Sequence, residues 1–151
     1  MKNLKSIMSV LVALWIVGVM PISARPRAKR IVMIALDGIS VPGFTTAHTP
    51  NLDNLLAQGA LSLTTRVVMP SVTLPNWTSH LTGSGPEQHG VVDNGWQIDK
   101  KGFPAVEIDK EGYYPSVFKV MKEEIPECKT AFYYNWINLF YPYNKKYLDE
   151  V

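Results

Sequence analysis

The chain has 151 residues, of which 46% are hydrophobic and 19% are charged. This length corresponds to about one domain, and the composition excludes a disordered or collagen-like protein. The net charge of +2 is accounted for by Lys2 and Lys5, and the lysine pairs at 100–101 and 145–146 are typical of solvated surface, so no nucleic-acid-binding stripe is expected.

The first 24 residues have the layout of a secretory signal peptide. A basic start precedes the apolar run 7–20, and the small residues that end at Ala24 offer a cleavage site. The run is too short for a comfortable membrane span, so an uncleaved signal segment would be the only membrane attachment. The sequence therefore predicts an exported protein, periplasmic or secreted, in which residues 25–30 form a polar linker.

The next segment, 31–36, is a short apolar run. It predicts a strand buried on both faces, as in a parallel sheet covered by helices. Asp37 follows directly and would lie at the carboxyl end of that strand, where open α/β sheets bind ligands. The alternative is that this aspartate caps the next turn. A carboxylate at a buried strand end normally needs a partner or a metal ion, which favours the functional role.

Residues 49–59 carry the start and stop signals of a helix. Thr49 is a candidate N-cap, Pro50 suits the first helical position, and Gly59 suits the residue just past the end. Leucines at helical spacing would form the face that covers the sheet. The chain then returns as a predicted strand over 61–69, which completes a right-handed strand–helix–strand unit.

Thr73 stands between this strand and a second predicted helix. Backbone N–H groups at a helix start have no partner within the helix and lie at the positive end of its dipole, so they stabilise an anion. Thr73 is therefore a candidate nucleophile beside an anion site. The alternative is that Thr73 is only the N-cap of the helix, which is a common role of threonine.

Three further features follow downstream. Asn94 precedes a glycine, a pair typical of a hairpin turn. The segment 115–124 predicts an amphipathic helix, and 130–134 predicts another strand. The apolar face of that helix would carry three residues: Val117, Val120 and Met121. The order of strands and helices indicates an α/β fold with a largely parallel sheet covered by helices.

Six short motifs lie in order at 34–38, 49–55, 70–76, 81–83, 86–91 and 93–94. Together they resemble the N-terminal part of the alkaline phosphatase superfamily, and in particular its type I phosphodiesterase, or nucleotide pyrophosphatase/phosphodiesterase, branch. The resemblance implies an alkaline-phosphatase-like α/β fold. Residues 31–151 would form an incomplete, N-terminal part of such a catalytic domain.

The resemblance implies roles for three residues. Asp37 would ligate one of two zinc ions, Thr73 would be the nucleophile bound to the same ion, and Asn94 would donate its amide to a phosphoryl oxygen. A zinc ion, or another divalent metal, lowers the pKa of a bound hydroxyl, so attack on phosphorus would give a phosphothreonine intermediate. The implied activity is hydrolysis of phosphodiester or pyrophosphate bonds in small, nucleotide-like substrates.

The other metal ligands of the family are expected beyond Val151, and the three histidines of this chain do not obviously replace them. Asp37 and Thr73 alone fall short of the three or four protein ligands that are usual at zinc. The chain is therefore expected to hold only part of the active site and to lack appreciable hydrolase activity by itself. Two alternatives remain open: a phosphomonoesterase of the same superfamily, and a non-catalytic exported remnant or binding module.

Overall fold

The computed structural model describes residues 29–100 and 102–151, and the chain divides into two units, Met1–Leu36 and Asp37–Val151. The predicted signal peptide and its cleavage site lie outside the described residues. In the first unit, the described residues 29–36 form neither helix nor strand, and their side chains are exposed. Among the residues that the structure describes, no helix is both long enough and apolar enough to cross a membrane.

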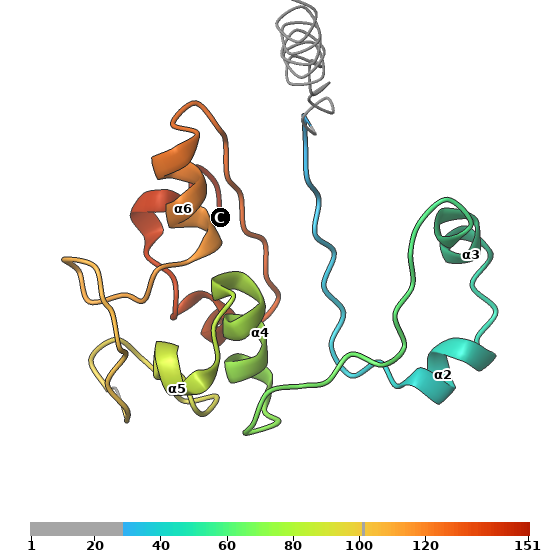
Figure 1. The fold of residues 1–151 in the computed structure, drawn as a ribbon, viewed down its shortest axis with the longest axis horizontal. Helices are drawn as coiled ribbons and strands as arrows, with labels where there is room; N and C mark the ends of the chain where they lie inside the picture. Colours follow the sequence, from blue (N-terminus) through green and yellow to red (C-terminus); the bar gives the residue numbers. More distant parts are fainter. Residues whose placement is uncertain (1–28, 101) are drawn as a thin grey trace, which may run out of the picture. The chain divides into compact units, whose positions relative to one another are not determined.

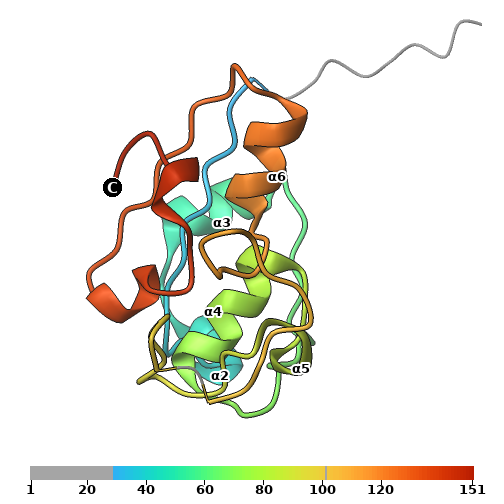
Figure 2. The same ribbon diagram turned by 90° about the vertical axis from the view of Figure 1, so that its left-hand side faces the viewer.

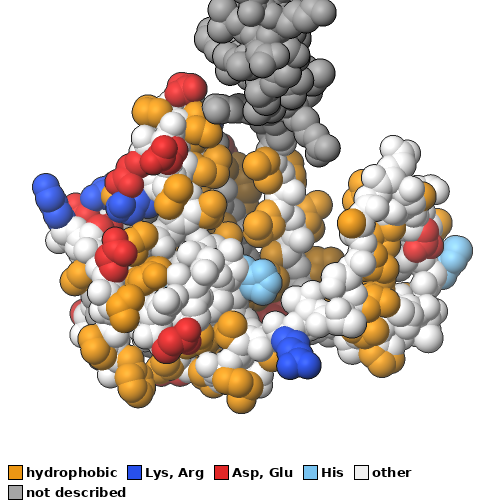
Figure 3. Space-filling model, in the orientation of Figure 1, with side chains coloured by type: hydrophobic (Ala, Val, Ile, Leu, Met, Phe, Trp, Pro, Cys, Tyr) orange, Lys and Arg blue, Asp and Glu red, His pale blue; other side chains and the backbone are white. Residues whose placement is uncertain are grey.

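The predicted parallel sheet is not formed in the described residues. The segment 31–36 has no strand partner, and Ile31 is 78% exposed. Of the other two predicted strands, 61–69 is irregular, and 130–134 contributes only one isolated parallel bridge, between Ala131 and Glu150. A strand is stabilised by backbone pairing and by burial of its side chains. Neither is available to the apolar run 31–36, and apolar side chains lie on the surface of the described residues (Figure 3).

Two short helices begin the second unit. Helix α2 spans Val41–Thr46 and α3 spans Pro50–Leu56. The second confirms the predicted helix and its proline start, but it ends at Leu56, before the predicted stop at Gly59. The hydroxyl of Thr49 donates to Asp53 Oδ1 instead of capping the backbone. Leu55 is 70% exposed. The leucine face of α3 therefore covers no sheet, and neither helix contacts another named helix of the described chain.

The remaining helical segments are listed here in chain order: α4 (Thr73–Thr82), α5 (Pro86–His89), α6 (Val117–Glu124), and the 3-10 helices η1 (Ile137–Phe140) and η2 (Lys145–Tyr147). Helix α4 contacts α5, α6 and η1, and α6 contacts η2. Both views show α5 and α6 beside α4 (Figures 1 and 2). Helix α4 is thus the element on which the packed part of the chain is built.

One face of α4 supplies both parts of the hydrophobic core. Its buried side chains include Leu74, Thr78 and Leu81, which recur at the helical spacing that lines a single face. The first leucine packs in a cluster with Val91 and Trp96, whereas the second packs with Phe118 and Tyr143. The two ends of one helix face therefore hold two different sets of neighbours.

The predicted apolar face of α6 is partly wrong. The helix is present, but its buried residue is Phe118, and Val117 and Val120 are 40% and 50% exposed. Spacing along the sequence identifies candidate faces, but the neighbours decide which face is buried. Here Leu81 and Tyr143 are the neighbours, and the larger phenylalanine ring occupies that position.

Candidate active site at the start of helix α4

The loop that leads into α4 is held by the side chain of Asn76. Its Oδ1 accepts a hydrogen bond from the Val68 N–H at 2.8 Å, and its Nδ2 donates to the Val72 carbonyl at 2.8 Å. The same nitrogen also lies 3.3 Å from the Pro70 carbonyl. A side chain in the first turn of the helix thereby satisfies the backbone of the preceding loop, which fixes the direction in which the chain enters at Thr73.

Thr73 is the first helical residue of α4, whereas the sequence predicts a helix that begins just after it, and Thr73 is not the N-cap. Val72 occupies the cap position, with φ of −116° and ψ of 153°. The Thr73 side chain is half-buried, and within the described residues its hydroxyl makes no hydrogen bond. The alternative role of Thr73 as a simple cap is therefore wrong.

The backbone N–H groups of this first turn are almost all accounted for. Leu74 donates to Asn94 Oδ1 at 2.8 Å, Pro75 has no N–H group, and Asn76 donates to the Val72 carbonyl at 3.3 Å. Among the described residues, the Thr73 N–H alone in this turn is left without an acceptor. The helix start thus leaves one unpaired backbone donor on the residue that also carries the unpaired hydroxyl.

Asn94 lies in a tight turn next to this donor. Asp93 Oδ1 accepts the Gly95 N–H at 2.7 Å, which closes the turn, and no strands flank it to form the hairpin that the sequence suggests. Because a backbone N–H can only donate, its bond to Leu74 requires Oδ1 of Asn94 to be the accepting end. The Nδ2 end makes no hydrogen bond among the described residues, and so remains available as a donor.

Asp37 is exposed, which corrects the prediction of a carboxylate at a buried strand end. Its Oδ1 accepts the Gly38 N–H at 2.7 Å, and its Oδ2 lies 3.4 Å from the indole nitrogen of Trp77. Trp77 is one helical turn after Thr73, and its carbonyl accepts a hydrogen bond from the buried Tyr143 hydroxyl at 3.2 Å. The structure therefore brings Asn94 to the start of α4 and Asp37 to its next turn.

These donors do not complete a metal site. Asp37 and Thr73 offer two ligand side chains, whereas zinc sites usually have three or four protein ligands. Within residues 29–100 and 102–151, no group of three or more His, Cys, Asp and Glu side chains could hold an ion. His80 packs its ring against Trp77, with 5.3 Å between ring centroids, and its Nδ1 lies 2.8 Å from the Asn76 carbonyl.

His89 has a structural environment. It is buried at the end of α5, where Nδ1 accepts the Val91 N–H at 3.0 Å and Nε2 lies 3.0 Å from Ser79 Oγ. Since Nδ1 accepts a backbone proton, the ring proton of the neutral form is on Nε2. Burial lowers the pKa of His89 to about 4. The ring is therefore neutral at pH 7 and ties α5 to α4.

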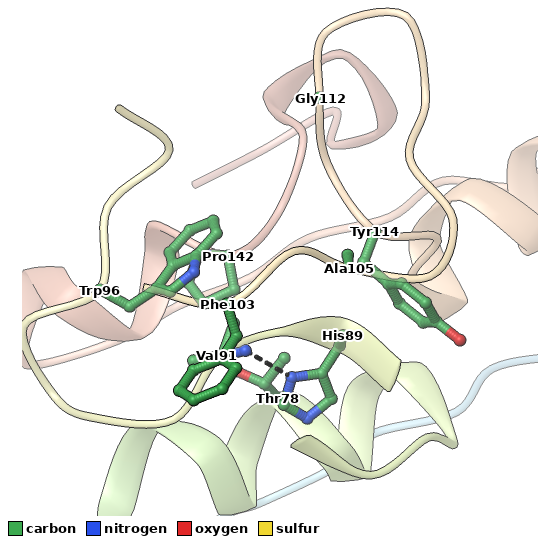
Figure 4. Close-up of a pocket in the computed structure, with 9 residues that line it drawn as sticks. All are labelled: Thr78, His89, Val91, Trp96, Phe103, Ala105, Gly112, Tyr114 and Pro142. Atoms are coloured by element: carbon green, nitrogen blue, oxygen red, sulfur yellow. Dashed lines mark hydrogen bonds between the residues drawn. The ribbon is translucent and has the colours of Figure 1, made fainter. Parts of the chain in front are cut away.

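A small hollow lies beside His89 and has room for about one water molecule (Figure 4). Its lining residues are Thr78, His89, Val91, Trp96, Phe103, Ala105, Gly112, Tyr114 and Pro142. The indole nitrogen of Trp96 is buried and has no hydrogen-bond partner within the described structure. Neither Thr73 nor Asn94 lines this hollow, so it is not the predicted active site.

Sequence reasoning missed two asparagines of this site. Asn76 lies in the motif at 70–76, and the signal for it was a polar amide directly after Pro75 at the start of the helix. Asn138 donates through Nδ2 to the Asn94 carbonyl at 2.8 Å from 44 residues further along the chain. No local pattern in the sequence marks such a distant partner.

Three characterised proteins are similar in sequence to parts of the chain. A mouse protein named bis(5'-adenosyl)-triphosphatase enpp4 is 30% identical over 83 residues, which are 54% of this chain and 18% of that protein. Mouse ectonucleotide pyrophosphatase/phosphodiesterase family member 3 is 33% identical over 66 residues, 42% of this chain and 8% of that protein. Venom phosphodiesterase of Macrovipera lebetinus is 23% identical over 148 residues, 72% of this chain and 17% of that protein.

The chain thus spans less than a fifth of the length of these relatives. No solved structure matches it. Over residues 31–146, however, the sequence matches the family described as type I phosphodiesterase / nucleotide pyrophosphatase. This range covers more than half of the chain and contains all six motifs. The chain belongs to the type I phosphodiesterase / nucleotide pyrophosphatase family.

Proposed function

We propose that this chain supplies the nucleophile and one oxyanion donor for hydrolysis of phosphodiester or pyrophosphate bonds. The observation that carries the proposal is the start of α4, where the hydroxyl and the N–H of Thr73 are both unpaired and the Asn94 amide is held beside them. Family membership supports the same reaction class.

In the proposed reaction, Thr73 Oγ1 loses its proton to solvent and attacks phosphorus, while the bond from phosphorus to the leaving alcohol or phosphate breaks and that group departs. The product is a phosphothreonine, which water then hydrolyses to release the second product and restore the hydroxyl. The Thr73 N–H and the Asn94 Nδ2 would each donate to a non-bridging phosphoryl oxygen. Donors fixed before the reaction stabilise the charge that develops on those oxygens, and the positive end of the helix dipole adds to this effect.

Asp37 is proposed to be a metal ligand, and zinc is the proposed metal. The described residues do not complete a zinc site, so metal-dependent turnover requires further donors. The substrate is proposed to be a small phosphoester with a nucleotide-like leaving group, since two of the relatives carry names that refer to nucleotide or adenosyl substrates. Residues 1–24 are proposed to direct export, and residues 31–151 to be part of the catalytic domain.

The test is Thr73→Ala in a polypeptide that also carries the further metal donors. Turnover of bis(4-nitrophenyl) phosphate should fall by about 10³-fold or more, and no phosphorylated protein should be trapped by acid quenching. Thr73→Ser, which keeps the hydroxyl, should retain measurable turnover and a phosphorylated intermediate. Full turnover by the alanine variant would show that Thr73 is not the nucleophile.

A second candidate function is a non-catalytic exported binding module, which the absence of a three-ligand metal group among the described residues favours. The Thr73→Ala comparison above distinguishes the two, and purified residues 25–151 with added zinc test whether this segment acts without further metal donors. No appreciable release of nitrophenol is expected from this segment alone, because it provides too few metal donors. Zinc-dependent release that Thr73→Ala abolishes would instead show that the segment holds a complete site.

A further inference from the structure

We infer that Asn138 is a positioning residue, which holds Asn94 so that its free amide end lies beside Thr73. The inference rests on the proposed function, because Asn94 is the proposed phosphoryl donor. Asn138 belongs to η1, and its Nδ2 donates to the Asn94 carbonyl at 2.8 Å. The side chain of the same Asn94 accepts the Leu74 N–H at 2.8 Å.

Asn94 is therefore held at two separate points. The bond from Asn138 fixes the peptide carbonyl of Asn94, and the bond from Leu74 fixes the oxygen of its side chain. With both oxygens occupied, the Nδ2 group is the part of the Asn94 side chain that is left to meet a ligand. A catalytic amide needs this kind of support, because a group that is free to rotate is ordered only at the cost of binding or activation free energy.

The donor itself is carried on a packed element. Leu139, the next residue of η1, and the preceding Trp136 both pack against the cluster formed by Leu74 and Trp96. The cluster includes residues before and after Asn94 in the chain, because Leu74 belongs to the first turn of α4 and Trp96 follows the turn that contains Asn94. Packing thus sets the position of η1, and the hydrogen bond from Asn138 holds the Asn94 backbone in place relative to η1.

The experiment is amide hydrogen exchange by NMR on the full chain and on Asn138→Asp. This variant keeps the size of the side chain but removes the N–H donor and places a carboxylate against the Asn94 carbonyl. Exchange of the Leu74 N–H should accelerate about five- to tenfold, which corresponds to the free energy of one hydrogen bond, here the bond from Asn138 that supports Asn94. The side-chain amide resonances of Asn94 should also move toward those of an exposed asparagine.

Asn135→Asp is the matched control, because Asn135 is exposed and makes no hydrogen bond among the described residues. It should leave the exchange of Leu74 unchanged. The exchange of Leu81, seven residues further along α4, serves as the reference for general loosening. Unchanged exchange at Leu74 in Asn138→Asp would overturn the inference, and so would equal acceleration at Leu74 and Leu81.

Asn138→Ala provides a second measurement if the aspartate variant is poorly folded. The alanine variant lacks the donor without adding a charge, and the same selective change at Leu74 is expected. Neither measurement needs turnover. A failure of the proposed reaction, seen in Thr73→Ala, is therefore distinguishable from a failure of this positioning role, seen in the exchange of Leu74.

Discussion

Two segments of the second unit contain apolar side chains, but only one segment buries them. In the packed segment, residues 73–151, Leu74 is fully buried within a cluster of neighbours. In the exposed segment, residues 37–68, Leu55 is 70% exposed although it belongs to a well-formed helix. The difference shows that helical spacing creates an apolar face, whereas burial requires another element to pack against that face.

The largest effect that tests this comparison is expected from Leu74→Ala. The substitution removes buried atoms and leaves a cavity in the cluster beside Val91 and Trp96. It should lower the free energy of unfolding by about 2–5 kcal/mol, measured by urea denaturation. Leu55→Ala makes the same chemical change at an exposed position and should cost less than about 0.5 kcal/mol. Similar losses for both variants would contradict the division into two segments.

The next effect concerns pH. The pKa of His89 is lowered from 6.5 to about 4 by burial, so at intermediate pH the folded chain leaves this ring neutral while the unfolded chain protonates it. The free energy of unfolding should therefore decrease as the pH falls from about 6.5 to about 4, by about 3 kcal/mol in total.

Urea denaturation at a series of pH values across this range measures that dependence. His89→Gln should flatten it, since the variant has no ring to protonate. His48→Gln, at an exposed histidine of the exposed segment, is the matched control and should behave as the parent chain does. If His89→Gln kept the full dependence, another group would have to be its source.

The smallest effect compares two glycines with positive φ. Gly90 has φ of 74°, and a Cβ atom there would lie 2.6 Å from the Phe103 carbonyl oxygen. Gly38 has φ of 75°, but a Cβ atom there would meet nothing within 4 Å. Gly90→Ala should therefore cost about 2–3 kcal/mol, as backbone strain plus a steric clash, and Gly38→Ala about 1 kcal/mol or less.

Thermal unfolding of the two glycine variants provides the measurement. Equal shifts in melting temperature would mean that the clash at Gly90 is relieved without cost by movement of the Phe103 backbone. A larger shift for Gly38→Ala would contradict the assignment of that residue to the exposed segment.

Helices α3, α4 and α6 were predictable because their signals are local. Pro50 lies at the first position of the helix that it starts. Thr73, followed by Pro75, likewise lies at the start of α4. The sheet was not correctly predicted for the described residues, because a strand depends on partners elsewhere in the chain. The apolar run 31–36 has the composition of a buried strand, but composition cannot supply the neighbour that would bury it.

For the candidate site too, local features were predictable from the sequence and distant contacts were not. The motifs identify Thr73 and Asn94, and the structure brings both to the start of α4. The roles of these residues in catalysis stay predictions, as does the role of Asp37 as a metal ligand. The support from Asn138 could not be read from the sequence, because a hydrogen bond between residues 44 positions apart has no period or spacing.

The hydrogen bond between the Leu74 N–H and Asn94 also determines whether the motif that contains Thr73 could be grafted onto another protein. The first turn of α4 has no side-chain cap of its own, and its cap comes from a residue 20 positions later. A short peptide that carried Thr73 and the following helix would therefore begin without its stabilising acceptor. The portable unit is not the threonine motif but the motif together with the turn at Asn94 and the segment η1, so a grafted site must include all three.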